Sequence, residues 1–330
     1  MPLRNRIERF AIRRISDGVL LSIVAASIVL LTLAATIRLF STGVELTLTT
    51  HSLSFVPAQR IDRDIDLQLA PGASIAAQDF TAIDASSLGC ERVSAERGLR
   101  VEGNLRLAHL NAEPGKALEL HLEDKGPLEI VLRGESTVAI GVGRDARVRR
   151  ADGSPITCHL PESSEGRETI RLMLSGETRS ANLQVWLGAI ESVRLLREIR
   201  LSAIDFIEPD AEQAQERTPV FRSAIDEGTL RLLDVRKNIS LTRGEPLRLE
   251  TLHGRATDMV LTPGGLNLKL TGVASAIRIG PEGFTNNLQP TWLAYLMAND
   301  TSQVSGLWAA AAALLGLLWN VRKWARSQRS

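Results

Sequence analysis

The stretch VELTLT at residues 44–49 alternates apolar and polar side chains, so that Val44, Leu46 and Leu48 share one face of an extended chain. The same period of two recurs at residues 64–69, 99–107, 118–122, 170–174, 183–187, 247–249 and 266–270. One apolar face and one wet face are typical of antiparallel strands that cover a core. The alternation therefore predicts an all-β domain.

Turn sequences separate these runs and indicate the architecture. Pro71-Gly72, Asp152-Gly153 and Pro263-Gly264 each follow or precede an alternating run. Short strands at this spacing predict a β-sandwich or jelly-roll-like domain. No helical pattern of about 10–15 residues intervenes, which argues against a doubly wound parallel sheet.

The β region is expected to have two parts, a β domain at residues 41–190 and a second β subdomain at residues 191–285. Around the boundary, Leu195, Leu196 and Ile199 leave helix and strand open. The polar, proline-bracketed residues 208–219 have the composition of a linker, and they fit a long hairpin loop equally well.

Two uncharged apolar segments flank the β region. Residues 18–37 and 302–321 contain no charged side chain, and about twenty helical residues span a hydrocarbon core of about 30 Å. We therefore predict transmembrane helices at residues 18–40 and 302–321. The alternatives are a cleaved signal peptide for the first segment and a buried core helix for the second.

The charges beside these segments predict the topology. Five arginines lie in residues 1–17, three arginines and one lysine lie in residues 322–330, and residues 284–303 contain no basic side chain. The positive-inside rule then makes both basic termini cytoplasmic and residues 41–301 extracytoplasmic. Arginine outnumbers lysine 34 to 5, as in a GC-rich bacterial genome, so the predicted location is the bacterial inner (cytoplasmic) membrane.

Composition excludes several classes of protein. The 330 residues are 44% apolar and 23% charged, which argues against a disordered chain. Residues 38–301 hold 30 basic and 36 acidic side chains, so this region is a poor partner for nucleic acid. No motif predicts a catalytic residue, a metal site or a cofactor. Asp62, Asp64 and Asp66 lack the glycine and glutamate of a calcium loop, and Gly141-Val142-Gly143 lacks the third glycine of a dinucleotide fingerprint.

The membrane-side residues are expected to include interface anchors and a packing face. An interfacial segment at residues 286–301 leads into the second helix. The candidate anchors are the aromatic residues Trp292, Tyr295, Trp308, Trp319 and Trp324. The candidate helix-packing positions are small residues, Ser22, Ala26, Gly306, Ala310, Ala312 and Gly316. Alanine-rich composition alone accounts for the small residues equally well.

Two further side-chain sets stand out in the β region. Cys90 and Cys158 both fall outside the predicted cytoplasmic parts, where disulfides persist, so we predict a structural bridge over the alternative of two buried thiols. Arg144, Arg147, Arg149 and Arg150 form a basic cluster in an acidic domain. This cluster is either an ordinary charged hairpin or a site for an anionic glycan or lipid headgroup.

The order of helix, large outer domain and helix resembles that of trimeric degenerin-type channels and of polysaccharide chain-length regulators, in topology alone. The leading hypothesis is a non-enzymatic envelope protein. Its β region binds a protein, glycan or lipid partner, and its helices dock in a membrane complex with another membrane protein or with further copies of the chain. The alternatives are a homo-oligomeric channel or pore subunit, and a periplasmic-facing hydrolase without a recognisable motif.

Overall fold

A computed structural model of the 330-residue chain describes residues 32–90, 98–123, 126–158, 168–176, 179–188, 192–209, 221–243, 246–280 and 286–299, with single helical residues at 22, 26, 29 and 316. These residues belong to two compact units. The β unit comprises Ser41–Leu233 and Lys237–Leu288. The terminal unit comprises Met1–Phe40, Asp234–Arg236 and Gln289–Ser330.

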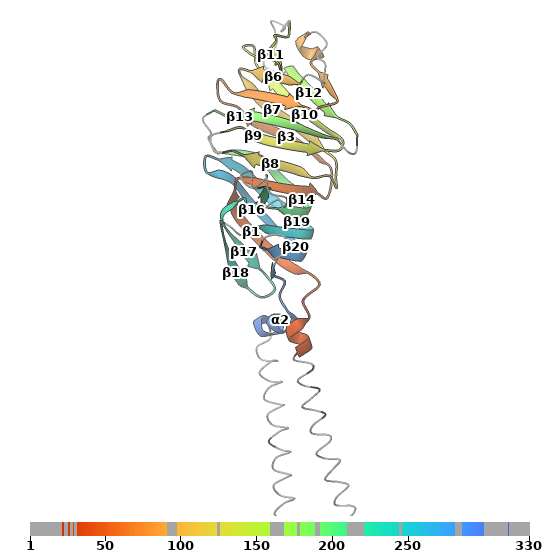
Figure 1. Ribbon diagram of the computed structural model, residues 1–330, viewed down its shortest axis with the longest axis vertical. Coiled ribbons are helices and arrows are strands. Elements are labelled where there is room, and N and C mark those ends of the chain that lie inside the picture. The colour runs from red at the N-terminus through yellow and green to blue at the C-terminus, as the bar shows by residue number, and fades with distance from the viewer. Residues whose placement is uncertain are drawn as a thin grey trace, which may run out of the picture. The chain divides into compact units, whose positions relative to one another are not determined.

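Two antiparallel sheets build most of the β unit (Figure 1), which confirms the predicted all-β class. The large sheet has 14 strands, in the order β11 (Arg147–Arg150), β6 (Leu99–Glu102), β4 (Ser74–Gln78), β13 (Ser180–Trp186), β9 (Leu128–Arg133), β8 (Leu118–Leu122), β2 (Ser52–Pro57), β14 (Val193–Asp205), β19 (Leu247–Thr262), β20 (Gly265–Ile279), β1 (Thr42–Thr50), β17 (Ile225–Leu232) and β18 (Lys237–Thr242), with β21 (Asn286–Asn287) beside β20. The small sheet has five strands, in the order β3 (Ile61–Gln68), β7 (Leu105–Ala112), β10 (Ser136–Val142), β12 (Glu168–Leu174) and β5 (Ala82–Asp84).

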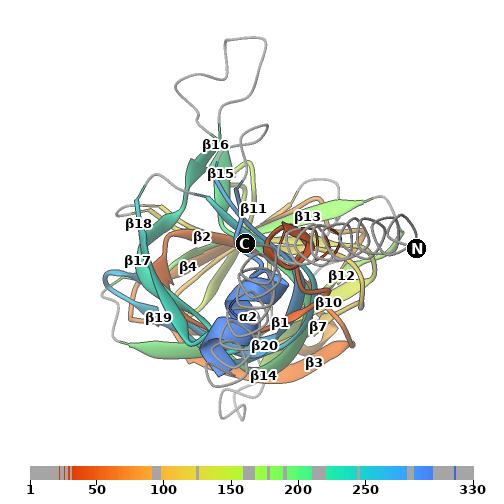
Figure 2. The same cartoon turned by 90° about the horizontal axis from the view of Figure 1, so that it is seen from below.

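Four further short elements lie in the described residues. Strands β15 (Ile207–Pro209) and β16 (Phe221–Ser223) pair with each other, and Figure 2 shows them together at one side of the β unit. A single 3₁₀ turn, η1 (Ser86–Leu88), follows β5. The helix α2 (Trp292–Asn299) belongs to the terminal unit.

The core forms as the alternation predicts. Val44, Leu46 and Leu48 of β1 are at most 3% exposed, whereas Glu45 and Thr47 between them face water. The small sheet lies in the same half of the β unit as strands β11 to β8 (Figure 1). Each of these sheets buries one face of its strands.

The longest hairpin contains a turn that the sequence predicts. Strands β19 and β20 pair over almost their whole length and reverse at Pro263-Gly264, between Thr262 and Gly265. Gly265 has a φ of 131°, a conformation that side-chain-bearing residues rarely adopt. A Cβ atom there would also lie 2.9 Å from the Thr50 carbonyl oxygen. Glycine is therefore required at this turn.

The β region is continuous across the boundary expected near residue 190. Strand β14 lies beyond that position, yet it pairs with β2 on one side and with β19 on the other. Residues 41–190 and 191–285 thus share one sheet and one compact unit. The ambiguous residues around Leu195 and Ile199 are strand, not helix.

The predicted transmembrane helices fall mainly on residues that the structure does not describe. Of the segments 18–40 and 302–321, it describes residues 22, 26, 29, 32–40 and 316. Within the described part of the chain, no helix is both long enough and apolar enough to cross a membrane. The basic termini at residues 1–17 and 322–330 also lie outside the described residues.

Candidate functional site

The terminal unit contains a two-strand contact that joins distant parts of the chain. Residues 37–39 and 289–292 run antiparallel, and we call this contact the clasp. Three hydrogen bonds hold it: Leu39 N–H to the Pro290 carbonyl at 2.9 Å, Trp292 N–H to the Ile37 carbonyl at 3.0 Å, and the Arg38 guanidinium to the Gln289 carbonyl at 3.0 Å. The clasp therefore brings the end of the first apolar segment beside the start of α2.

Helix α2 begins at the clasp and carries two of the predicted anchors. The Thr291 hydroxyl accepts a hydrogen bond from the Ala294 amide at 3.3 Å, as an N-cap side chain does. Trp292 and Tyr295 meet edge to face, with ring centroids 6.0 Å apart. No residue of α2 is buried, and residues 292–299 carry no charge.

Large apolar side chains are exposed mainly in the terminal unit. Six of the eight such side chains among the described residues belong to it: Val29, Leu33, Ile37, Phe40, Trp292 and Met297. Phe40 is 88% exposed. Single exposed apolar residues are ordinary, but this concentration on an uncharged helix and its partner segment is typical of an interaction surface.

The other predicted membrane residues are described only in part. Ser22, Ala26 and Gly316 are exposed residues in helical conformation. The remaining candidates, Gly306, Ala310, Ala312, Trp308, Trp319 and Trp324, lie outside the described residues.

The predicted basic cluster is divided between the two faces of the edge strand β11. Arg147 and Arg149 point to one face, whereas Arg150 alternates to the other and donates to the Ser154 hydroxyl at 3.3 Å. Arg144 lies in the preceding turn.

The face with Arg147 and Arg149 also includes two residues that no sequence signal identified. The register sets Arg149 opposite Arg100 on β6, and Arg100 lies over the Trp186 ring at 5.5 Å. The Arg100 guanidinium pairs with Glu102 at 2.9 Å, so part of its charge is neutralised locally. Only the register of β6, β4 and β13 brings these residues to one face, so spacing in the sequence could not reveal them.

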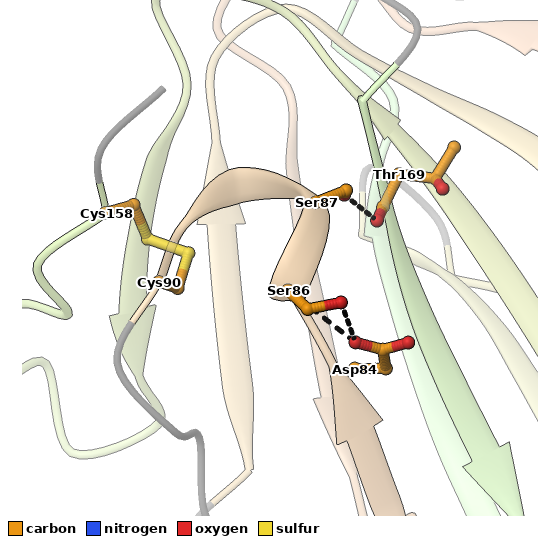
Figure 3. The surroundings of a disulfide bond; sticks show 6 residues. All are labelled: Asp84, Ser86, Ser87, Cys90, Cys158 and Thr169. Carbon is orange, nitrogen blue, oxygen red and sulfur yellow. Dashed lines mark hydrogen bonds between the residues drawn. A yellow bond between two sulfur atoms is a disulfide. The ribbon is translucent and has the colours of Figure 1, made fainter. Parts of the chain in front are cut away.

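Cys90 and Cys158 form the predicted disulfide. Figure 3 shows how the turn before Cys90 is fixed: the Ser87 hydroxyl donates to the Thr169 carbonyl of β12 at 2.8 Å, and the Asp84 carboxylate accepts from the amide and hydroxyl of Ser86. Those two Ser86 hydrogen bonds lower the pKa of Asp84. The bridge thus joins an anchored turn to the segment that follows β11.

The described residues show no arrangement of side chains that would hold a metal ion. No group of three or more His, Cys, Asp or Glu side chains in the described part of the chain is arranged to hold a metal ion. No protein-family model matches the chain, and no curated protein is significantly similar to it. The terminal unit is therefore the strongest candidate site.

Proposed function

We propose that this chain is a two-pass protein of the bacterial inner membrane. Its β unit lies outside the cytoplasm and binds a protein, glycan or lipid partner, and its two helices dock in a membrane complex. The role is binding rather than catalysis.

The clasp is the observation that carries this proposal. In an antiparallel pair, the residues before one segment and those after the other lie at the same end. The apolar residues 18–37 precede the first clasp segment, and residues 302–321 follow the second. The described residues that lead into the two apolar segments therefore lie at the same end of the clasp, which supports a pair of membrane helices with both termini on one side.

The exposed side chains of the terminal unit support the same function. Trp292 and Tyr295 have amphipathic rings, which favour the headgroup level of a bilayer. An uncharged helix with no buried residue gains by lying in that layer, where its apolar side chains leave water.

Reporter fusions test the topology directly. A fusion at residue 330 should be active with a cytoplasmic reporter, and an insertion at residue 210 should be active with a periplasmic one. Activity of a cytoplasmic reporter at residue 210 would refute the proposal. Purification of the full chain in a mild detergent, with identification of the proteins that accompany it, tests the docking in a complex.

A further inference from the structure

A groove runs along the outer face of the small sheet, over its central strand β10. The outward side chains of β10 are small, namely Thr137, Ala139 and Gly141, whereas the inward ones fill the core. The flanking strands β7 and β12 carry longer outward side chains. The result is a trough of about 760 Å³, which we call the β10 groove.

The strand register fixes which residues face each other across this groove. Ala139 pairs with His109 of β7 on one side and with Arg171 of β12 on the other. Gly141 pairs in the same way with Arg106 and Thr169. Neighbouring strands are about 4.8 Å apart, so the two walls stand about 10 Å apart at the backbone. That width fits a single sugar ring.

Glycine at position 141 makes room for one wall residue. A Cβ atom there would lie 2.6 Å from both Cγ and Nε of Arg106, so the arginine side chain lies across the strand at this point. Gly141 does not have a positive φ. A Cβ atom at position 141 would therefore displace the Arg106 side chain rather than strain the backbone.

Carboxylates hold the histidine at the other end. The two ring nitrogens of His109 lie 2.9 Å from Asp62 and 2.9 Å from Asp64. A neutral imidazole carries one N–H, so both hydrogen bonds form together only when the ring is protonated. Asp64 lines the groove and its side chain is 92% exposed, which leaves its oxygens accessible to a ligand.

The opposite wall offers a guanidinium group. Arg171 forms no hydrogen bond or ion pair with any residue in the described part of the chain. Asp84, which lies opposite Arg171 in the strand register, interacts with it electrostatically, and the Asp84 carboxylate already accepts two hydrogen bonds from Ser86. Arg171 therefore retains its donors for a ligand in the groove.

We propose that the β10 groove binds a sugar ring that carries one carboxylate, as a unit of an acidic oligosaccharide. Arg171 holds the carboxylate, a geometry in which guanidinium groups bind with two parallel hydrogen bonds. Asp64 accepts hydrogen bonds from the ring hydroxyls, and Asn111, Thr137 and Thr169, which also line the groove, complete the polar contacts.

The lining disfavours other classes of ligand. Among the described residues, no Phe, Tyr or Trp and no large apolar side chain lines the groove, so an apolar ligand gains little there. Strand β10 is hydrogen-bonded on both sides, to β7 and β12, so a peptide cannot add as a further strand.

This inference deepens the proposed function, on which it rests, because it names the ligand class of the extracytoplasmic β unit. The test is titration calorimetry of the purified full chain in detergent, with trigalacturonic acid as the probe and maltotriose as its neutral counterpart. We expect trigalacturonic acid to bind at least about ten-fold more tightly than maltotriose. The difference corresponds to one charge-assisted contact, between Arg171 and a carboxylate that maltotriose lacks.

Two variants and one control locate the binding. Arg171→Gln removes the guanidinium group, and Ala139→Leu fills the floor of the groove; each should weaken trigalacturonic acid binding about ten-fold or more. Arg231→Gln, an exposed arginine on β17 of the large sheet, should bind like the wild type. Circular dichroism should show all three variants folded.

Three results would overturn the inference: equal affinity for maltotriose, unchanged affinity in the folded Arg171→Gln or Ala139→Leu variant, or no binding of trigalacturonic acid at millimolar concentration. None of them bears on the membrane topology, because the reporter fusions do not require the groove. Failure of the topology, in turn, leaves the calorimetry unchanged.

Discussion

Asp205 is a carboxylate whose surroundings disfavour its ionised form. It lies on β14 opposite Arg248 of β19, whose Nε donates to it at 2.8 Å. Burial raises the pKa of Asp205, and the Arg248 charge offsets only part of that effect. The ionised carboxylate is therefore less favourable in the folded protein than in the unfolded chain.

This shift predicts a pH dependence of stability. A raised folded-state pKa contributes stability that is fully present below the ordinary aspartate value of 3.8 and is lost as pH rises through the folded value. Relative to Asp205→Asn, the wild type should lose free energy of unfolding as pH rises from about 4 to neutrality. Urea unfolding of both proteins across that range measures the difference. Parallel curves would contradict the prediction.

The disulfide predicts both a labelling result and a loss of stability. Thiol labelling of the unreduced, denatured protein should find neither Cys90 nor Cys158, which the structure joins across a sequence separation of 68. On the chain-entropy model, closing a loop of this length stabilises the fold by about 4 kcal/mol. The Cys90→Ser, Cys158→Ser double variant should lose up to that free energy of unfolding. Quantitative labelling of both cysteines would refute the bridge in solution.

At the scale of elements, alternation predicted strands such as β8, β12 and β13, whose pairing is regular. It left β14 undecided because two register shifts, between Arg194 and Leu196 and between Leu201 and Ile204, interrupt the period of two. Leu195 and Leu196 are consequently both buried although they are adjacent. A bulge of this kind mimics helical spacing, so the sequence alone could not decide between helix and strand.

The β10 groove shows why site residues were harder to predict than strands. His109 and Arg171 face each other only because β7 and β12 flank β10. No local motif links them, and the neighbouring acidic run and glycine pair fit no known consensus. The disulfide was predictable because the predicted compartment, rather than the register, favoured it.

At the scale of the whole molecule, the large sheet links the first and last parts of the β unit. Strand β1 pairs only with β17 and β20 among the described strands, and both come from the second half of the region. The chain must therefore close its longest-range contacts before its first strand is paired. The clasp in the terminal unit is likewise a contact between segments far apart in the sequence, residues 37–39 and residues 289–292. Both ends of the β region are thus fixed by contacts between distant segments.

The contacts that fix the β region do not involve the small residues of segment 302–321, so assembly through these residues can be tested without disturbing the fold. The variant Gly316→Leu makes this test. The apolar segment 302–321 contains small residues four apart, Gly306 with Ala310 and Ala312 with Gly316. Because lipid gives helices no hydrophobic drive to associate, such positions favour contact by letting backbones approach closely. A leucine at position 316 blocks that approach but lies far in sequence from the strands of the β unit.

We therefore expect Gly316→Leu to lower the oligomer size or the recovery of partner proteins in mild detergent, with membrane insertion and the circular dichroism of the strands unchanged. The matched control is Ala311→Leu, which adds the same side chain about 140° around a helix from position 316. A contact through the small-residue face is disturbed by the first variant and spared by the second. If Gly316→Leu leaves co-purification and oligomer size as in the wild type, this helix face takes no part in assembly, and docking must depend on the first helix, α2 or the β unit.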